Sequence, residues 1–181
     1  MEFARPVSGP KGQPLDRVWE GSGRRSGAAV ARVDCRLARS GCVGQPFGPQ
    51  RKTAEIALRN VPAMPEIVPE LAEINVGGWQ GLRRAEIEKL EPRLATGSQS
   101  ERFEVYFSSP GGESYDAFSA RIRSVLEAAQ RPTVIVAHGI VGCVLRGLWL
   151  GLERSQLAGL PGGQGCIFHL KEGREEVLWP S

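Results

Sequence analysis

The sequence predicts an α/β fold with a largely parallel sheet, and two neighbouring segments carry most of that prediction. Residues 133–137 form a short apolar run, rich in β-branched side chains and bounded by Pro132 and Gly139. Such a run is typical of a strand buried on both faces. The next apolar side chains recur at helical spacing, at positions 141, 144, 145 and 148. A strand followed at once by a helix is the repeating unit of an α/β layer fold.

Three further helices are predicted before this strand. Residues 53–60 are expected to form a short helix, and three prolines then impose an extended connection. A second helix is predicted over residues 83–90, because Pro92 stops it from continuing. Ser114 is a suitable N-cap for the third helix, residues 115–130, whose apolar side chains share one face.

The end of the chain is expected to hold one helix and two strands. The helix after the buried strand is predicted over residues 141–151, from the apolar spacing described above. Residues 165–170 and 175–179 have the composition of two closing strands, and the turn between them is placed around Gly173. From residue 51 onward, strands and helices therefore alternate as an α/β fold requires.

Residues 1–50 differ from the rest of the chain. They are rich in Gly, Arg, Ser and Pro, and no window keeps a period of 2 or 3.6 residues. At 181 residues the chain is expected to be a single domain, 1–181, with an irregular N-terminal region that is divergent or disordered. The sequence leaves open whether this region is a natural replacement or the product of a frameshift.

Composition excludes several functional classes. The net charge is +3, with 23 basic and 20 acidic residues that are interspersed, so no nucleic-acid footprint is expected. The four cysteines form no CxxC pair and there are two histidines, so no zinc-type spacing exists. The chain lacks an apolar leader and any segment of transmembrane length, so a cytoplasmic location without membrane contact is expected.

His138 is the first candidate for a functional side chain. It stands at the C-terminal end of the predicted strand, immediately before a helix whose free N–H groups favour an anion. Ligands of open α/β sheets bind at this edge. The alternative is a histidine that only completes hydrogen bonds in a strand-to-helix turn, and position alone does not decide between them.

Four short blocks resemble those of the histidine phosphatase (phosphoglycerate mutase-like) superfamily and stand in the family's order. Residues 71–82, LAEINVGGWQGL, resemble its LxE…GxWEG segment. Residues 109–114, SPGGES, resemble its PGGES helix start, which is followed by a helix with Arg121. Residues 134–139, VIVAHG, resemble the VVSHG strand with the second active-site histidine, and residues 53–56, TAEI, resemble a QTAEI helix.

The resemblance covers roughly residues 45–181 and implies both a fold and a chemistry. Family members are three-layer sandwiches, with helices on both faces of a mostly parallel central sheet and a phosphate pocket at its C-terminal edge. A nucleophilic histidine in an N-terminal Arg-His-Gly motif takes the phosphoryl group. A second histidine and two arginines hold the phosphate oxygens, and a glutamate protonates the leaving alcohol. No metal or cofactor is implied.

Mapped onto this chain, the resemblance identifies two catalytic candidates. His138 matches the second histidine, and Glu73, in the LxE position, matches the acid. Gly139 follows His138 and is the implied backbone contact to phosphate. Without the resemblance, Glu73 is a solvated charge in a loop. His169 lies in a predicted closing strand outside every family block, so it is expected to be structural or to face solvent.

The rest of the family site is missing from the sequence. No Arg-His-Gly motif exists, and Lys11, in Pro10-Lys-Gly, stands nearest to the nucleophile's place. The second arginine's place holds Pro49, with Arg51 close by as a substitute phosphate contact. A lysine is protonated at its ordinary pKa of about 10.4, so it can hold a phosphate but cannot attack one. Gln80 replaces the glutamate of the family's WEG segment.

The resemblance therefore implies a protein that acts on or binds a small phosphomonoester, a phosphorylated metabolite or the phosphate ion, with impaired catalysis. An active phosphatase or mutase with an unidentified nucleophile remains open. The alternative is a non-catalytic phosphate-binding or interaction module, or the product of a disrupted gene. Nucleic-acid binding by residues 1–50 is disfavoured, because aromatic side chains are scarce there. The substrate and the oligomeric state, including a homodimer, are not specified.

Overall fold

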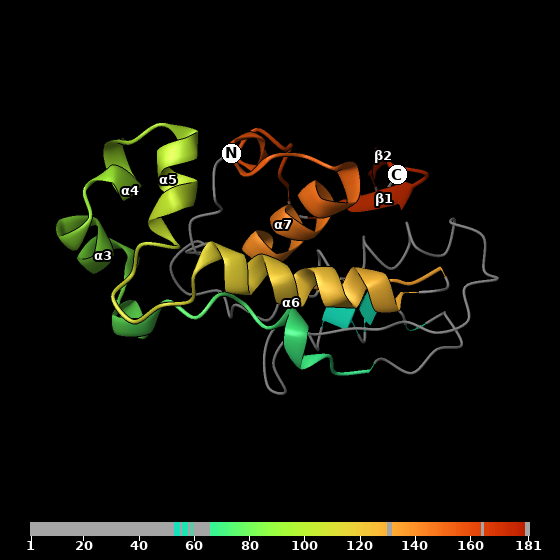
Figure 1. Ribbon diagram of the computed structural model, residues 1–181, viewed down its shortest axis with the longest axis horizontal. Helices are drawn as coiled ribbons and strands as arrows, with labels where there is room; N and C mark the ends of the chain where they lie inside the picture. The colour runs from blue at the N-terminus through green and yellow to red at the C-terminus, as the bar shows by residue number, and fades with distance from the viewer. Residues whose placement is uncertain are drawn as a thin grey trace.

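The structure is a computed structural model that describes residues 53, 54, 56, 57, 59, 66–129, 132–163 and 165–179. It combines helices with one antiparallel hairpin near the C-terminus, so the described part is of mixed α and β structure (Figure 1). Our expectations for residues 1–50, including Lys11, and for Arg51 lie outside the described residues. Of the predicted helix 53–60, residues 53, 54, 56 and 57 are described and are helical.

The long helix α6, Tyr115–Ala128, confirms the helix predicted over residues 115–130. Its N-cap is Ser114, whose hydroxyl accepts a hydrogen bond from the backbone N–H of Ala117 at 3.2 Å. This bond satisfies one of the N–H groups that the first turn leaves free. Phe118 and Ile122 lie one helical turn apart and are fully buried, so this face of α6 belongs to the core.

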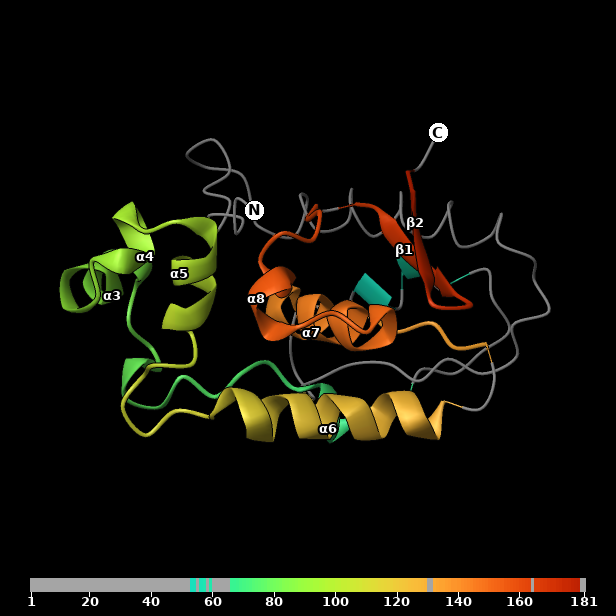
Figure 2. The same cartoon turned by 45° about the horizontal axis from the view of Figure 1, so that its top comes forward.

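Helix α7, Gly139–Leu150, begins two residues before the predicted start at residue 141. His138 is its N-cap in an extended conformation, and Gly151, with φ of 66°, ends it. Seven of its twelve residues are buried, as expected for a helix that is apolar on most of its surface. α6 runs beneath α7 and the short helix α8, Arg154–Leu157 (Figure 2).

The main core forms where α6 and α7 pack against residues 68–76. A short 3-10 helix, η1 at Pro69–Leu71, lies in that segment, and a second, η2 at Gly77–Trp79, follows it. Leu71 of η1 is fully buried against the helices. The largest side chains that are entirely inside the protein are Phe103, Phe118, Leu71, Ile122, Leu157, Val105, Val141 and Val144.

A group of three short helices lies to one side of α6 and α7 (Figure 1). α3, Arg84–Leu90, confirms the helix predicted over residues 83–90. α4, Arg93–Thr96, and α5, Gln99–Val105, were not predicted. Ser98 and Glu101 form a reciprocal capping box at the start of α5, a sequence signal that apolar periodicity does not reveal.

The hairpin of β1, Ile167–Lys171, and β2, Arg174–Leu178, confirms the two closing strands. The strands are antiparallel, and His169 is opposite Glu176. Gly173 lies in the turn with φ of 70°, as the sequence predicts. Arg146 of α7 reaches the hairpin, where its side chain is 5% exposed and pairs with the Glu175 carboxylate at 2.5 and 2.6 Å. Its guanidinium also lies over the Phe168 ring, 3.7 Å from the centroid.

The strand predicted over residues 133–137 is not assigned as a strand in the structure, so that expectation is corrected. Residues 132–138 belong to no helix or strand, and residues 134–137 are half-buried rather than enclosed on both faces. An apolar, β-branched run satisfies strand propensity, but a strand also needs neighbours that complete its ladder of hydrogen bonds, which sequence pattern does not supply. Among the described residues the assigned sheet is the two-stranded antiparallel hairpin.

Within the described ranges, no helix has the length and apolar character needed to cross a bilayer.

The Arg146–Glu175 pair gives a first prediction. Arg146→Met leaves the buried Glu175 carboxylate without its partner, so we expect the free energy of unfolding to fall by about 3 kcal/mol. Lys171→Met removes an ion pair whose side chains are 70% and 80% exposed, and should change stability by less than about 0.5 kcal/mol. Urea unfolding of both variants measures this. Equal effects would show that the buried pair does not hold the hairpin to α7.

Candidate functional site

Glu73 is positioned by the extended segment that follows η1. Leu71 and Ile74 on either side of it are buried, which fixes the path of the backbone. The carboxylate turns back on its own chain, where Oε1 accepts a hydrogen bond from the Ile74 N–H at 3.0 Å. Glu73 is therefore not a solvated charge in a loop, and its side chain remains only 28% exposed.

His138 approaches Glu73 from a distant part of the sequence. The Nδ1 atom of His138 lies 3.7 Å from Oε2 of Glu73, and each side chain is 28% exposed. This distance is longer than a hydrogen bond but within the range of an ion pair. Gly139 is the first residue of α7 and adjoins its N-cap, His138. These two predicted site residues therefore lie together at the start of that helix.

Burial shifts the pKa values of the two groups in opposite directions. Burial is the largest cause that raises the pKa of Glu73 from 4.5 to about 7. Backbone N–H groups of Ile74, Ile140 and Val141 and the charge of Arg121 oppose this, because each favours the carboxylate. Burial also lowers the pKa of His138 below its usual 6.5. Near pH 7 the pair therefore includes a large fraction of protonated Glu73 beside neutral imidazole.

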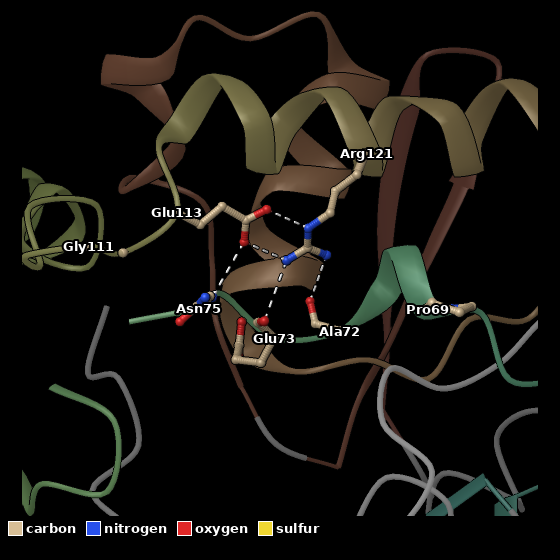
Figure 3. A pocket seen from close by; sticks show the side chains of 8 residues that line it. Pro69, Ala72, Glu73, Asn75, Gly111, Glu113 and Arg121 are labelled. Carbon is tan, nitrogen blue, oxygen red and sulfur yellow. Dashed lines mark hydrogen bonds and ion pairs between the residues drawn. The ribbon is translucent and has the colours of Figure 1, made fainter. Parts of the chain in front are cut away.

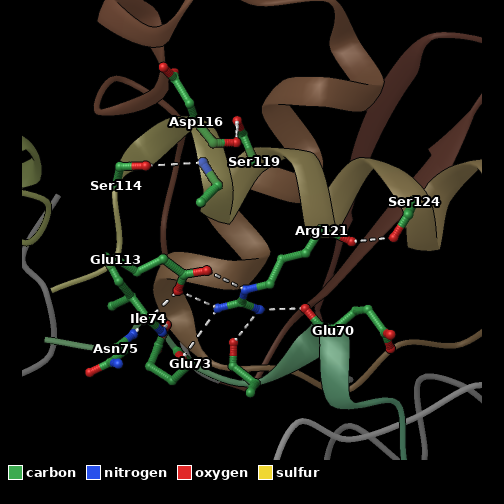
Figure 4. A network of polar contacts seen from close by, with 12 residues as sticks. Glu70, Glu73, Ile74, Asn75, Glu113, Ser114, Asp116, Ser119, Arg121 and Ser124 are labelled. Atoms are coloured by element: carbon green, nitrogen blue, oxygen red, sulfur yellow. Dashed lines mark hydrogen bonds and ion pairs between the residues drawn. The ribbon is translucent and has the colours of Figure 1, made fainter. Parts of the chain in front are cut away.

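Arg121 of α6 joins the Glu73 segment to the rest of the fold (Figures 3 and 4). Its Nε and Nη2 atoms donate to the two oxygens of Glu113 at 2.7 and 2.9 Å. Nη1 donates to the carbonyl oxygens of Glu70 and Ala72, the latter at 2.7 Å. Nη2 also donates to the carbonyl oxygen of Glu73 at 3.4 Å. One guanidinium thus contacts three backbone carbonyl oxygens within four residues of the segment that carries the candidate acid.

The two blocks that resemble LxE…GxWEG and PGGES contact each other directly. Gly78 N–H donates to the Pro110 carbonyl at 2.8 Å, and Glu113 N–H donates to the Asn75 carbonyl at 2.8 Å. Gly77 has φ of 48° and packs so closely that a Cβ there would overlap the backbone of residues 110–112. Only glycine meets both conditions without strain. The two blocks, which are separate in the sequence, therefore form one packed unit beside Glu73.

A shallow pocket of about 430 Å³ lies next to this unit (Figure 3). Its lining combines the Glu73 segment with the loop before α6: Pro69, Ala72, Glu73, Asn75, Gly111, Gly112, Glu113 and Arg121. Within the ranges that the structure describes, no group of three or more potential ligand side chains is placed to hold a metal ion.

Sequence reasoning missed a phenol near the acid. Tyr106, at the C-terminal end of α5, has its pKa raised mainly by burial, and the charge of Glu73 raises it further, while Arg84 lowers it. Helix α5 was not predicted, so nothing in the sequence pattern placed this residue near Glu73. His169, in contrast, lies in β1 with a 39% exposed side chain, 3.8 Å from Glu176, as expected for a histidine outside the site.

Comparison with known proteins places this chain in a family. The sequence model of the histidine phosphatase superfamily (branch 1) matches residues 46–179. A curated relative, 6-phosphofructo-2-kinase 1 of Saccharomyces cerevisiae, is 26% identical over 112 residues. That match spans 60% of this chain but only 14% of the yeast protein.

Solved structures share the fold at low sequence identity. A mycobacterial glucosyl-3-phosphoglycerate phosphatase is 22% identical, with a TM-score of 0.64 over 90% of this chain and 85% of its own. Its complex with inorganic phosphate gives 21% and 0.65, covering 91% and 86%. YhfR of Bacillus stearothermophilus gives 21% and 0.67, covering 96% and 87%. With the family model matched over most of its length, this chain belongs to the histidine phosphatase superfamily, branch 1.

Proposed function

We propose that this protein binds inorganic phosphate or a small phosphomonoester at the start of α7 and is catalytically impaired. The observation that carries the proposal is the 3.7 Å approach of Glu73 to His138 at the N-terminal end of that helix. A histidine and a helix N-terminus can bind the oxygens of an anion such as phosphate, and a carboxylic acid can protonate the oxygen of a leaving group. The phosphate complex of a structural neighbour supports phosphate as the ligand class.

In this proposal each group has a distinct part in binding or catalysis. The first N–H groups of α7, beginning at Gly139, donate to the phosphate oxygens, and those of Ile140 and Val141 do so in place of their contact with the Glu73 carboxylate. His138 donates a hydrogen bond to one phosphate oxygen. Protonated Glu73 is the acid that would donate to a leaving alkoxide, which a pKa of about 7 permits near neutral pH. Ionised Glu73 would instead repel the anion, so binding and acid catalysis both require its proton.

The missing step is acceptance of the phosphoryl group. The chain has no Arg-His-Gly motif, and loss of the covalent nucleophile together with its arginines removes parts that act as a unit. In this proposal Lys11 and Arg51 contribute at most positive charge to phosphate binding. The second candidate function is a non-catalytic phosphate-binding or interaction module, including the product of a disrupted gene, and the absent motif favours it over an active mutase.

The finer architecture belongs to the same proposal. We infer that residues 1–181 are a single domain with the family's three-layer sandwich, a mostly parallel central sheet and helices on both faces. The TM-scores of 0.64 to 0.67 against family-like structures support this arrangement. We also propose a cytoplasmic location and a homodimer. The binding chemistry described above requires no cofactor.

Phosphate binding should depend on the protonation of Glu73. We expect the affinity for inorganic phosphate, measured by isothermal titration calorimetry, to fall about tenfold between pH 6 and pH 8.5, because the carboxylate becomes a like charge beside the anion. Glu73→Gln keeps the shape without the charge and should reduce this change to less than about threefold. The ionisation of phosphate itself affects both proteins equally. His138→Ala should abolish phosphate binding. Phosphate binding that persists in this variant would show that the site does not include His138.

Turnover should be absent or very low. The purified chain, assayed at neutral pH with a small aryl phosphate and with phosphoglycerate, should release no phosphate above background and form no acid-labile phosphoenzyme. Robust turnover that disappears in His138→Ala would contradict this and make His138 the leading nucleophile candidate.

The raised pKa of Glu73 also predicts how stability changes with pH. The folded state holds the Glu73 proton up to about pH 7, whereas the unfolded chain loses it near pH 4.5, so stability falls as pH rises through this window. Glu73→Gln removes that loss and should be more stable than the native protein by up to about 3 kcal/mol at pH 8, with little difference at pH 4.5. Urea unfolding across this range measures the difference. Glu172→Gln, at an 80% exposed side chain, is the control and should show none.

A further inference from the structure

We propose that Arg121 is the positioning residue of this site, held in place by Glu113, and that it fixes the backbone carrying Glu73 against the start of α7. The inference rests on the proposed role of Glu73 as the acid beside His138. It assigns no contact between Arg121 and phosphate.

The hydrogen bonds of Arg121 account for all of its donors. A guanidinium has five N–H groups in a rigid planar fork. Two of them meet the Glu113 carboxylate and three meet the carbonyl oxygens of Glu70, Ala72 and Glu73. Figure 4 shows this fork between the carboxylate and the segment below α6. Because Arg121 has no N–H left for a further acceptor, it does not replace either phosphate-clamping arginine of the family.

Glu113 and the packing of α6 fix the orientation of the fork. The Arg121 and Glu113 side chains are 21% and 17% exposed, so water competes little for their two parallel bonds. The guanidinium also lies over the Phe118 ring at 4.4 Å. Glu113 reaches the other end of the same segment, because its Oε2 accepts from the Asn75 N–H at 3.4 Å and its own N–H donates to the Asn75 carbonyl. The backbone is thus held on both sides of Glu73.

A lysine at position 121 would keep the charge but lose this geometry. An ammonium group is a point charge with three donors and cannot bridge the carboxylate and three carbonyl oxygens as a planar fork does. Without the fork, the carbonyl oxygens of residues 70, 72 and 73 lose their hydrogen bonds from α6, and Glu73 is free to leave the start of α7. A carboxylate that leaves this buried place becomes solvated, and its pKa moves toward the ordinary value.

The test compares Arg121→Lys with Arg123→Lys, a substitution at an exposed position of the same helix. The pKa of Glu73 is measured by NMR titration of the side-chain carboxyl carbons, with the signal assigned from its absence in Glu73→Gln. We expect the pKa to fall in Arg121→Lys from about 7 by at least one pH unit, and to stay unchanged in Arg123→Lys. Phosphate affinity at pH 6 should fall about tenfold in the first variant and less than twofold in the second.

Other outcomes overturn the inference. If Arg121 acts only through its charge, or only stabilises the fold, the pKa of Glu73 stays unchanged in Arg121→Lys even where the melting temperature falls. If Arg121→Lys does not fold, Glu113→Gln decides the question, because it weakens the orientation of the fork and should lower the same pKa by a smaller amount. The titration needs no phosphate, so failure of the native protein to bind phosphate would refute the proposed function and leave the positioning role tested separately.

Discussion

The guanidinium of Arg121 is the contact on which the arrangement of the candidate site depends. It belongs to α6, yet three of its bonds go to backbone carbonyls about fifty residues earlier in the chain. Apolar packing places α6 beside α7, and Leu71 seals the same core. Packing alone does not orient an extended segment, since it is not directional. The planar set of hydrogen bonds from Arg121 supplies that direction and so determines where Glu73 lies.

The electrostatics of the Glu73–His138 pair follow from where the core ends. Both side chains lie at its margin, buried enough to disfavour charge but close enough to solvent to exchange protons. The N–H groups at the start of α7 favour negative charge at the same place. Under the proposed function, the carboxylate and a bound phosphate are two anions that would compete for one favourable location. A proton on Glu73 relieves that competition, which makes the local chemistry sensitive to pH near neutrality.

Sequence patterns predicted the elements whose signals are local. α6 has a serine cap and one apolar face, α7 is apolar on most of its surface, and the hairpin has glycine at its turn. The short helices α4 and α8 contain four residues each, too few to show a helical period. Helix α5 has seven residues, as α3 has, but the Ser98–Glu101 capping box marks its start, and apolar spacing does not reveal that signal. The proposed strand over residues 133–137 depends on partners elsewhere in the chain, so its composition was not sufficient.

The site residues also differ in whether a local sequence signal identifies them. His138 stood out by its position before a helix, whereas Glu73 was identified only through the family resemblance, because a lone glutamate after a 3-10 turn has no distinguishing pattern. The hydrogen bonds from Arg121 to the Glu73 segment could not be predicted from sequence spacing, because their acceptors are backbone carbonyl oxygens, which every sequence provides. Membership in the histidine phosphatase superfamily, shown by the match over residues 46–179, agrees with the resemblance of these blocks.

The most direct test of this account is a crystal structure of the protein grown or soaked with phosphate at pH 6. We expect an anion within hydrogen-bonding distance, about 2.7–3.2 Å, of the His138 ring and the first N–H groups of α7, with the Glu73 carboxyl group beside it. A phosphate bound elsewhere with this location filled only by water, or Glu73 turned away from His138, would contradict it.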